Sequence, residues 1–428
     1  MTVSRLFTGF PWNLLGASQY QMLPLIQVAS VTGVYGVSFL IIWLSLALYA
    51  ASHRIVRHPG VRLGWQGEVM LPLGALVVLY GSGMMQLHER AQPGDQLHAT
   101  LVQPSIPQTM IWDEQQNDRR FADLLALSTA ALTNETDVLI WPEAAVPQMV
   151  RYDEATYNAV SGLARSNHVW MIIGSDDAVR REHPTPGNDA DYFNASFLIS
   201  PSGELANWYH KRQLVVFGEY VPLTRWLPFL QRLTPITGGF TSGTRPVTFD
   251  LILPHHEVDP TNNAIITLVN PDQAMVRRGG VKTSTLICFE DVFPHLARHY
   301  VKPDTDFLVN LTNDGWFGEG AEQWQHAASA VFRAVENGVP LIRCANNGLT
   351  CWIDAHGVIR KVFRDASGSI YGPGALSVDI PLRPLGTDRT PTFYNEHGDV
   401  FGWSCVVIAV GVLLRRIPWP RPRKWGDV

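Results

Sequence analysis

Long uncharged, mostly apolar runs flank a central region in which the pattern is mixed. Residues 6–52 contain no Asp, Glu, Lys or Arg, and residues 33–51 are nearly all apolar. Residues 69–88 form a second uncharged run, and residues 400–414 form a shorter third one. Because about 20 apolar residues cross a bilayer, the pattern predicts two spans before the central region. The third run is either a span extended by Arg415 and Arg416 or a buried core helix.

Short strand-like runs alternate with helical patterns in the central region. Several of these runs are continuously apolar, as expected for strands covered on both faces. Helical periodicity covers three segments, and turn residues at 201–203 and 354–357 indicate two hairpins. The alternation predicts an α/β fold with an antiparallel component. The predicted strands are residues 99–103, 138–141, 169–174, 196–200, 285–288, 307–311, 341–344 and 351–354, and the predicted helices are 117–132, 157–167 and 324–337. Residues 250–282 indicate a surface insertion.

Charge predicts an orientation in the membrane. Basic residues gather at 53–62 and again at 415–424, and the positive-inside rule places both segments in the cytoplasm. The central region would then face the periplasm of a bacterium. The chain has a net charge of −5 and its central region has no polybasic block, so nucleic acid is not an expected partner.

These patterns divide the chain into four predicted segments. Residues 1–92 form membrane segments, a re-entrant or partial span and two transmembrane helices. Residues 97–390 form a periplasmic catalytic domain, residues 399–417 a C-terminal transmembrane helix, and residues 418–428 a basic cytoplasmic tail. Four cysteines are present without zinc-type spacing, so no metal is expected. An oxidising compartment would permit a disulfide between Cys344 and Cys351, but we expect two buried residues on neighbouring strands.

Three short motifs carry candidate chemistry. Trp-Pro-Glu ends at Glu143, Tyr-His-Lys ends at Lys211, and Cys288 ends the apolar run of Leu-Ile-Cys-Phe-Glu. A thiol attacks only as its thiolate, so it needs a base and a nearby cation. Glu143 could accept the proton, and Lys211 could stabilise an oxyanion, which is worth about 3–4 kcal/mol for one such donor. This set acts on carbonyl carbon and requires no cofactor.

The order and contexts of these residues resemble the carbon–nitrogen hydrolase (nitrilase) superfamily. Further motifs resemble its bacterial apolipoprotein N-acyltransferase branch more closely. These motifs lie at residues 6–12, 103–108, 112–114, 217–222, 313–318, 324–326, 333–337 and 346–348. The resemblance runs from about residue 6 to the last apolar run.

The resemblance implies a four-layer α-β-β-α sandwich flanked by transmembrane helices in the bacterial inner membrane. Cys288 would take an acyl chain from a phospholipid as a thioester. It would then pass the chain to the amine of an S-diacylglyceryl cysteine at a lipoprotein N-terminus. Eight further residues would position the substrates or support the nucleophile: Glu219, Glu290, Phe289, Trp112, Trp316, Phe317, Trp12 and Asn347.

Two departures from the family pattern concern the N-terminus and the nucleophile. Family members have more spans before the Gly-Phe-Pro-Trp motif, which begins here at Gly9, so we expect that N-terminal spans are lacking. Phe289 stands where the family usually has Tyr, which removes a hydroxyl group beside the nucleophile. Two other interpretations fit the same residues: a membrane-anchored amidase or nitrilase that uses water, and an inactive truncated remnant.

Overall fold

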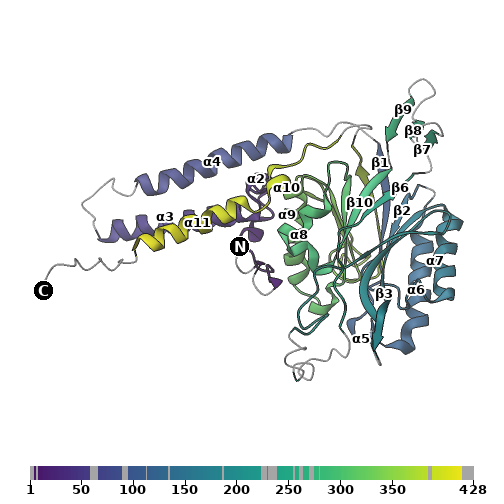
Figure 1. Ribbon diagram of the computed structural model, residues 1–428. Helices are drawn as coiled ribbons and strands as arrows, with labels where there is room; N and C mark the ends of the chain where they lie inside the picture. The colour runs from purple at the N-terminus through teal and green to yellow at the C-terminus, as the bar shows by residue number, and fades with distance from the viewer. Residues whose placement is uncertain are drawn as a thin grey trace.

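The computed structural model describes most of the chain, and the polypeptide forms a two-sheet body from which apolar helices project (Figure 1). The described residues are 4–5, 8–57, 66–88, 95–111, 113–133, 135–185, 188–222, 229, 239–253, 256–259, 264–268, 274–278, 280–383 and 388–416.

The first sheet has the strand order β15-β1-β2-β3-β4-β5. Strands β1, β2 and β3 are parallel, whereas β15, β4 and β5 pair antiparallel with their neighbours. Helices α6 (Asn117–Ala131) and α7 (Glu154–Asn167) cover its outer face (Figure 1). The strands are β1 (Gln96–Gln103), β2 (Val138–Ile140), β3 (Trp170–Thr185), β4 (Asn188–Ile199), β5 (Leu205–His210) and β15 (Gly374–Pro381).

The second sheet has the order β14-β13-β12-β11-β10-β6. Its three central strands β10, β11 and β12 are parallel, and the others are antiparallel to their neighbours. Helices α8 (Pro294–Ala297) and α9 (Glu322–Asn337) lie on its outer side (Figure 1). The strands are β6 (Thr248–Leu251), β10 (Val281–Ile287), β11 (Phe307–Thr312), β12 (Leu341–Ala345), β13 (Cys351–Ile353) and β14 (Ile359–Val362).

Alternating side chains of each sheet fill two different cores. Val138 and Ile140 point into the core between the two sheets, whereas Leu139 packs beneath the outer helices. This follows from the period of two along a strand. The sheets also meet at Cys344, whose thiol lies 3.4 Å from the carbonyl oxygen of Val102. The predicted four-layer α-β-β-α sandwich is therefore confirmed.

Each predicted strand and helix corresponds to an observed element, but two boundaries differ in an informative way. Cys288 is not part of the strand 285–288, because β10 ends at Ile287 and Cys288 begins the 3-10 helix η6 (Cys288–Val292). Strands β3 and β4 are much longer than predicted, because they form one extended hairpin whose polar positions hide the strand pattern. Both predicted turns connect antiparallel strands, β4 to β5 and β13 to β14.

The insertion 250–282 forms a separate antiparallel sheet from β7 (His256–Asp259), β8 (Ala264–Leu268) and β9 (Ala274–Arg278).

Cys344 and Cys351 are both buried and free, on neighbouring strands, which confirms the preferred interpretation of this pair.

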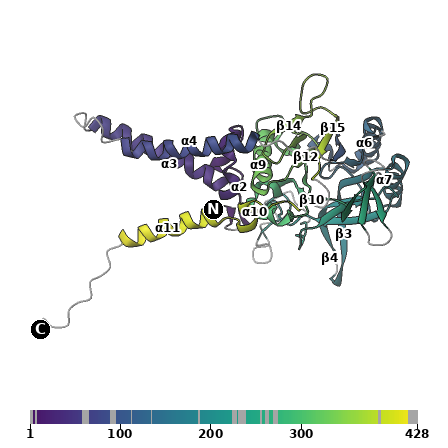
Figure 2. The same ribbon diagram turned by 90° about the horizontal axis from the view of Figure 1, so that it is seen from above.

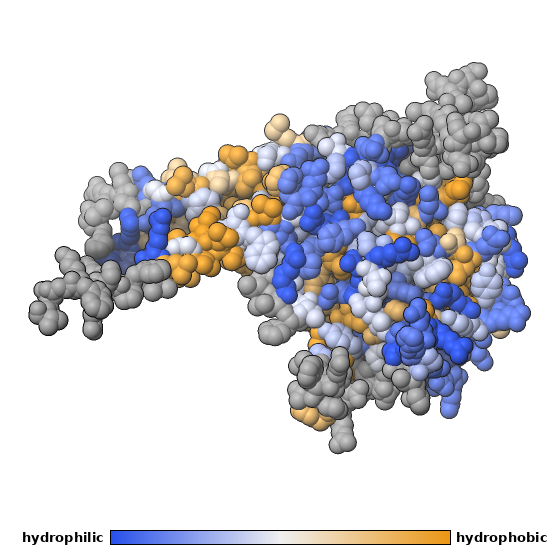
Figure 3. All heavy atoms as spheres, viewed as in Figure 1, coloured by the Kyte–Doolittle hydropathy of each residue, from blue (hydrophilic) through white to orange (hydrophobic). Residues whose placement is uncertain are grey.

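The apolar runs form the projecting helices α3 (Val34–Arg57), α4 (Gln66–His88) and α11 (Val400–Arg416). By length and composition α3 and α4 could each cross a membrane, while α11 is shorter. Most residues of α11 are exposed, among them Ile408 at 66%, so this helix is not packed within the core of the two-sheet body. Figure 2 shows α3 and α4 side by side and α11 diverging from them. Figure 3 shows apolar side chains gathered over these helices and mostly polar ones over the body.

Short helical turns join the projecting helices to the body. They are η3 (Leu15–Gln19), α1 (Leu23–Ile26), α2 (Ala29–Thr32) and α10 (Phe393–His397), and no long helix is described in residues 8–32. The backbone N–H of Val34 donates to buried Glu336 of α9 at 2.8 Å. Gly33 has φ of +65°, and a Cβ there would lie 2.5 Å from the ring of Tyr394. A close approach of α2 to α10 thus fixes the start of α3.

Candidate active site

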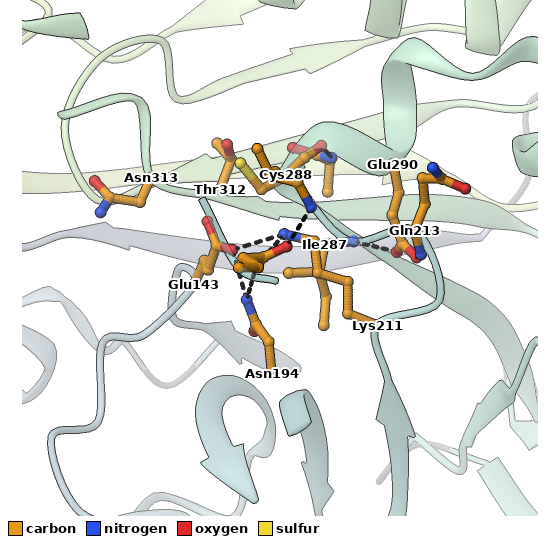
Figure 4. A network of polar contacts seen from close by, with 12 residues as sticks. Glu143, Asn194, Lys211, Gln213, Ile287, Cys288, Glu290, Thr312 and Asn313 are labelled. Atoms are coloured by element: carbon orange, nitrogen blue, oxygen red, sulfur yellow. Dashed lines mark hydrogen bonds and ion pairs between the residues drawn. The ribbon is translucent and has the colours of Figure 1, made fainter. Parts of the chain in front are cut away.

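A cavity of about 310 Å³ opens where strands of both sheets end. Glu143 follows β2, Lys211 follows β5, and Cys288 follows β10, so both sheets contribute to the site. Figure 4 shows these three side chains converging on one point. The cavity walls are otherwise mainly apolar and aromatic.

Lys211 lies between two carboxylates. Its Nζ donates to Glu219 Oε1 at 2.7 Å and to Glu143 Oε1 at 3.2 Å, and its side chain is 1% exposed. Burial alone would lower the pKa of Lys211, but the two carboxylates outweigh this effect and raise it. Lys211 therefore stays protonated in the site. Asn194 completes the arrangement, because its amide donates to the same oxygens of Glu143 and Glu219 at 2.8 and 3.0 Å.

Glu143 has one carboxylate oxygen available for chemistry. Its Oε1 accepts from Lys211 and Asn194, whereas its buried Oε2 has no hydrogen-bond partner among the described residues. Ala144, directly after it, has φ of +50°, which an L-residue adopts only when the surrounding structure imposes it. The strand end is therefore bent so that Glu143 faces the cavity.

Cys288 is held in a similarly unfavourable backbone conformation, with φ of +50°. The amide of Asn310 donates to its carbonyl oxygen at 3.1 Å, which fixes the turn. Burial raises the pKa of the Cys288 thiol, Glu143 raises it further, and Lys211 partly offsets both effects. Lys211 alone would favour the thiolate by lowering the thiol pKa, but burial and Glu143 have larger effects. In the resting site the thiol is protonated, so a base is required.

Glu290 connects the two loops that carry Lys211 and Cys288. Its carboxylate accepts the backbone N–H groups of Arg212 at 2.7 Å, Gln213 at 3.1 Å and Ile287 at 2.8 Å. The hydroxyl of Tyr209 donates to the same group at 2.7 Å. Burial raises the pKa of Glu290, while these hydrogen bonds lower it. Glu290 thus holds the two loops together by accepting hydrogen bonds from their backbone amides.

Aromatic side chains from the N-terminal segment pack against Phe289, the residue after Cys288. The ring of Phe10 lies 5.4 Å from that of Phe289, and Trp12 stacks on Phe289 at 6.1 Å. Trp12 also contacts Phe317 at 5.2 Å. Trp316 and Phe317 line the cavity and are 56% and 45% exposed. The predicted aromatic residues near Cys288 therefore come together, although they are distant in the sequence.

Of the other predicted residues, one is not described and one lies away from the cavity. Trp112 lies outside the described residues. Asn347 does not line the cavity: its amide donates to Ser105 Oγ at 3.0 Å and to the Tyr371 carbonyl at 3.2 Å. It therefore stabilises the loop after β12.

Four polar residues that line the cavity were not predicted as site residues, and Asn313, directly after β11, is one of them. Asn194 and Asp176 lie on the long β3–β4 hairpin, where polar positions gave no strand signal, yet both line the cavity. His326 also lines it and bridges Asp291 and Asp314, each at 2.8 Å. Its Trp-Gln-His motif is visible in the sequence, but spacing alone does not relate it to the cavity.

Within the described part of the chain, no group of His, Cys, Asp or Glu side chains is placed to hold a metal ion.

Comparisons with known proteins extend over most of the chain. The family model described as carbon-nitrogen hydrolase matches residues 98–389, and the one described as apolipoprotein N-acyltransferase N-terminal domain matches residues 2–47. Among solved structures, a mutant of the amidase from Nesterenkonia sp. AN1 is 17% identical, with a TM-score of 0.43, over 68% of this chain and 93% of that chain.

Two curated relatives bear the name apolipoprotein N-acyltransferase. The protein from Geobacter metallireducens is 35% identical over 411 residues, which are 95% of this chain and 70% of that protein. The protein from Bradyrhizobium diazoefficiens is 31% identical over 421 residues, which are 96% of this chain and 70% of that protein. With both family models and these relatives in agreement, the chain belongs to the apolipoprotein N-acyltransferase family of carbon–nitrogen hydrolases.

Proposed function

We propose that this protein transfers a fatty acyl chain from a membrane phospholipid, through a Cys288 thioester, to the N-terminal amine of an S-diacylglyceryl cysteine. The observation that carries the proposal is the meeting of Glu143, Lys211 and Cys288 in a cavity with largely apolar walls. A lipid acyl chain fits such walls, and an ester carbonyl is the electrophile that a thiolate attacks.

The first half-reaction acylates the cysteine. Glu143 accepts the thiol proton through its free Oε2 while the sulfur attacks the ester carbonyl carbon. The carbonyl oxygen becomes an oxyanion, which the protonated Lys211 stabilises. When the carbon–oxygen bond breaks, the leaving alkoxide takes the proton from Glu143 and departs as a lysophospholipid. The product on the enzyme is a thioester.

The second half-reaction repeats these roles with an amine. The neutral α-amine attacks the thioester carbonyl carbon, and its nitrogen loses a proton to Glu143. Collapse of the intermediate forms the amide and breaks the carbon–sulfur bond. The thiolate of Cys288 regains its proton from Glu143, which restores the resting site.

The proposed location follows from the projecting helices. We propose that α3, α4 and α11 cross the bacterial inner membrane and that the two-sheet body faces the periplasm. The helices α3 and α4 are apolar and long enough, and Arg54 and Arg57 end the first of them. Phe10 and Trp12 then bring the cavity close to the lipid, because their segment leads directly into the projecting helices.

The proposal is tested by intact-protein and peptide mass spectrometry after incubation of the membrane-embedded protein with phospholipid. We expect a fatty acyl adduct on Cys288 that disappears when a diacylglyceryl lipopeptide is added, with formation of a triacylated product. Cys288→Ala is the control and should form no adduct. A folded wild-type protein that forms no adduct, or hydrolyses amides instead, would contradict the proposal and favour the water-using alternative.

A further inference from the structure

A second, polar cleft adjoins the cavity that contains Cys288. It has a volume of about 490 Å³ and shares Ile111, Ala144 and Asp176 with the first cavity. Its remaining lining comes from η4 (Glu114–Gln116), the start of α6 and the loop after Glu143. The additional lining residues are Glu114, Asn117, Arg120, Val146, Pro147 and Gln148. The two spaces therefore adjoin at these three shared residues, and one has a mainly apolar lining whereas the other has a mainly polar one.

The two parts face different regions of the molecule. Phe10 and Trp12, next to the projecting helices, line only the apolar part. Glu114 and Arg120 line only the polar part and lie on the α5–α6 side of the body (Figure 1), where α5 is Gln108–Ile111. A ligand that fills both must be apolar at one end and polar at the other. The lipidated cysteine of the proposed acceptor, followed by its peptide, has this form.

Asp176 lies at the junction and carries uncompensated charge. In the described part of the chain no cation pairs with its carboxylate. Burial first, then the carboxylates of Glu143 and Glu219, raise the pKa of Asp176 to about 7. Lys211 pairs with Glu143 and Glu219, and His326 with Asp291 and Asp314, so among the described lining residues neither cation is paired with Asp176. Such a site attracts a second cation.

The polar cleft suits a peptide better than a lipid phosphate. Glu114 and Asp176 would repel a phosphate, whereas the amide N–H groups of Asn117 and the amide of Gln148 can pair with a peptide backbone. The Oδ1 of Asn117 already accepts from Arg120 Nη1 at 3.3 Å. Arg120 is 4% exposed, and its Nη1 already donates to the carbonyl oxygens of Met110 and Ile111, at 3.1 and 2.6 Å. The guanidinium therefore holds the cleft wall together.

We propose that the polar cleft binds the peptide that follows the lipidated cysteine of the acceptor, and that Asp176 receives its α-ammonium group. This inference rests on the proposed function and specifies its acceptor site. The ammonium gives one proton to the Asp176 carboxylate, and the resulting neutral amine attacks the thioester as described above. A carboxylate that titrates near neutral pH suits this exchange.

The test measures the two half-reactions separately in the full chain, with Asp176→Asn compared with Asp123→Asn. Asp123 is an exposed carboxylate on α6, outside both cavities, so it is a matched control. The first measurement is the rate of acyl-Cys288 formation from phospholipid. The second is the rate at which the preformed adduct transfers to a diacylglyceryl cysteine methyl ester or to a diacylglyceryl pentapeptide.

We expect the wild type to use the pentapeptide at a concentration at least tenfold lower than the methyl ester. Asp176→Asn should reduce transfer to both acceptors at least tenfold more than it reduces adduct formation, and Gln148→Ala should remove the preference for the pentapeptide. Gln148 is exposed on the rim, so this second variant leaves the buried strands unchanged. Asp123→Asn should behave as wild type.

Two results would overturn the inference while leaving the proposed function intact. One is an adduct that Asp176→Asn and Gln148→Ala transfer to both acceptors as the control does. The other is that Asp176→Asn and Gln148→Ala change the rate of adduct formation for some phospholipid headgroups but not for others. That result would show that the cleft binds the donor. Failure of the wild type to form any adduct would instead contradict the proposed function.

Discussion

At the scale of single residues, hydrogen bonds give Glu143 and Lys211 different proposed roles, the base and the cation. Lys211 is fixed as a cation by two carboxylates, and Glu143 directs one oxygen to Lys211 and Asn194 while the other has no partner among the described residues. Burial and Glu143 keep the Cys288 thiol protonated at rest. Activation therefore depends on proton transfer at the moment of attack rather than on a resting thiolate.

Glu143→Gln is predicted to slow acylation of Cys288 by a factor of about 10²–10⁴, the usual contribution of a general base. The amide keeps the size of the side chain but cannot accept the thiol proton. The measurement is the single-turnover rate of adduct formation. Glu204→Gln makes the same change at an exposed position on the β4–β5 turn. As the control, it should keep the wild-type rate. A wild-type rate in Glu143→Gln would show that another group accepts the thiol proton of Cys288.

Glu290→Gln is predicted to lower the free energy of unfolding by about 1–3 kcal/mol, because buried donors lose an acceptor. The neutral amide has one acceptor oxygen, whereas the carboxylate accepts three backbone N–H groups and the Tyr209 hydroxyl. Thermal unfolding in detergent measures the change. An unchanged melting temperature would show that the loops do not depend on Glu290.

At the scale of elements, α9 contacts both the walls of the site and the start of the projecting helix α3. His326 at its first turns bridges Asp291 of η6 and Asp314 of η8 (Asp314–Phe317), and Arg343 of β12 pairs with both carboxylates. This buried cluster connects the turn after Cys288 with the wall that contains Trp316. At the other end of α9, Arg333 pairs with Glu336 at 2.7 Å, and Glu336 binds the start of α3.

The cluster around His326 predicts a pH-dependent stability. Burial and Arg343 alone would lower the pKa of His326, but Asp291 and Asp314 raise it to about 9 from an ordinary 6.5. Because the folded protein holds this proton more tightly, the stabilisation is complete below about pH 6.5 and is lost between about pH 6.5 and 9. Melting temperatures measured across this range should fall more steeply for the wild type than for His326→Gln. Parallel profiles would contradict the assignment.

Glu336→Ala is predicted to lower the free energy of unfolding by about 3–5 kcal/mol, since it leaves the charge of Arg333 buried without its partner. It also removes the acceptor for the Val34 N–H, so α3 should become more susceptible to limited proteolysis at its start. Glu396→Ala, an exposed position on α10, is the control. Equal protease resistance of the two variants would show that α3 is held by other contacts.

At the scale of the whole molecule, apolar helices project from the two-sheet body (Figure 1), and the segment that leads into them supplies Phe10 and Trp12 to the cavity that contains Cys288. The exposed side chains of α3 and α4 are apolar along much of each helix, and Figure 3 shows the change to a polar surface at the body. Under the proposed function, an acyl donor dissolved in a bilayer would enter the cavity on the side lined by Phe10 and Trp12.

This arrangement predicts the accessibility of cysteines introduced on either side of the membrane. In spheroplasts of a bacterial host, an impermeant thiol reagent should label Asp118→Cys on the body but not Arg57→Cys at the end of α3, relative to the wild-type background. Both positions are exposed, so burial does not explain a difference. Labelling of Arg57→Cys before lysis would reverse the proposed orientation.

The sequence by itself determined the α/β layers and the projecting apolar helices, and it predicted that Glu143, Lys211 and Cys288, which line one cavity, carry the chemistry. Strand and helix periods, turn residues and short motifs are local features, so they can be read without coordinates. Phe289 and Phe317 were also recognised through motifs, and the structure places both rings against Trp12.

Only the tertiary structure decided what surrounds these residues. Asn194, Asp176 and His326 reach the site from a polar hairpin and a helix face, positions whose meaning depends on contacts far along the chain. The positive φ of Cys288, the free oxygen of Glu143 and the junction with the polar cleft are likewise set by packing. Residue types specify the reactive groups, whereas distances, burial and competing charges, which arise on folding, specify how those groups behave.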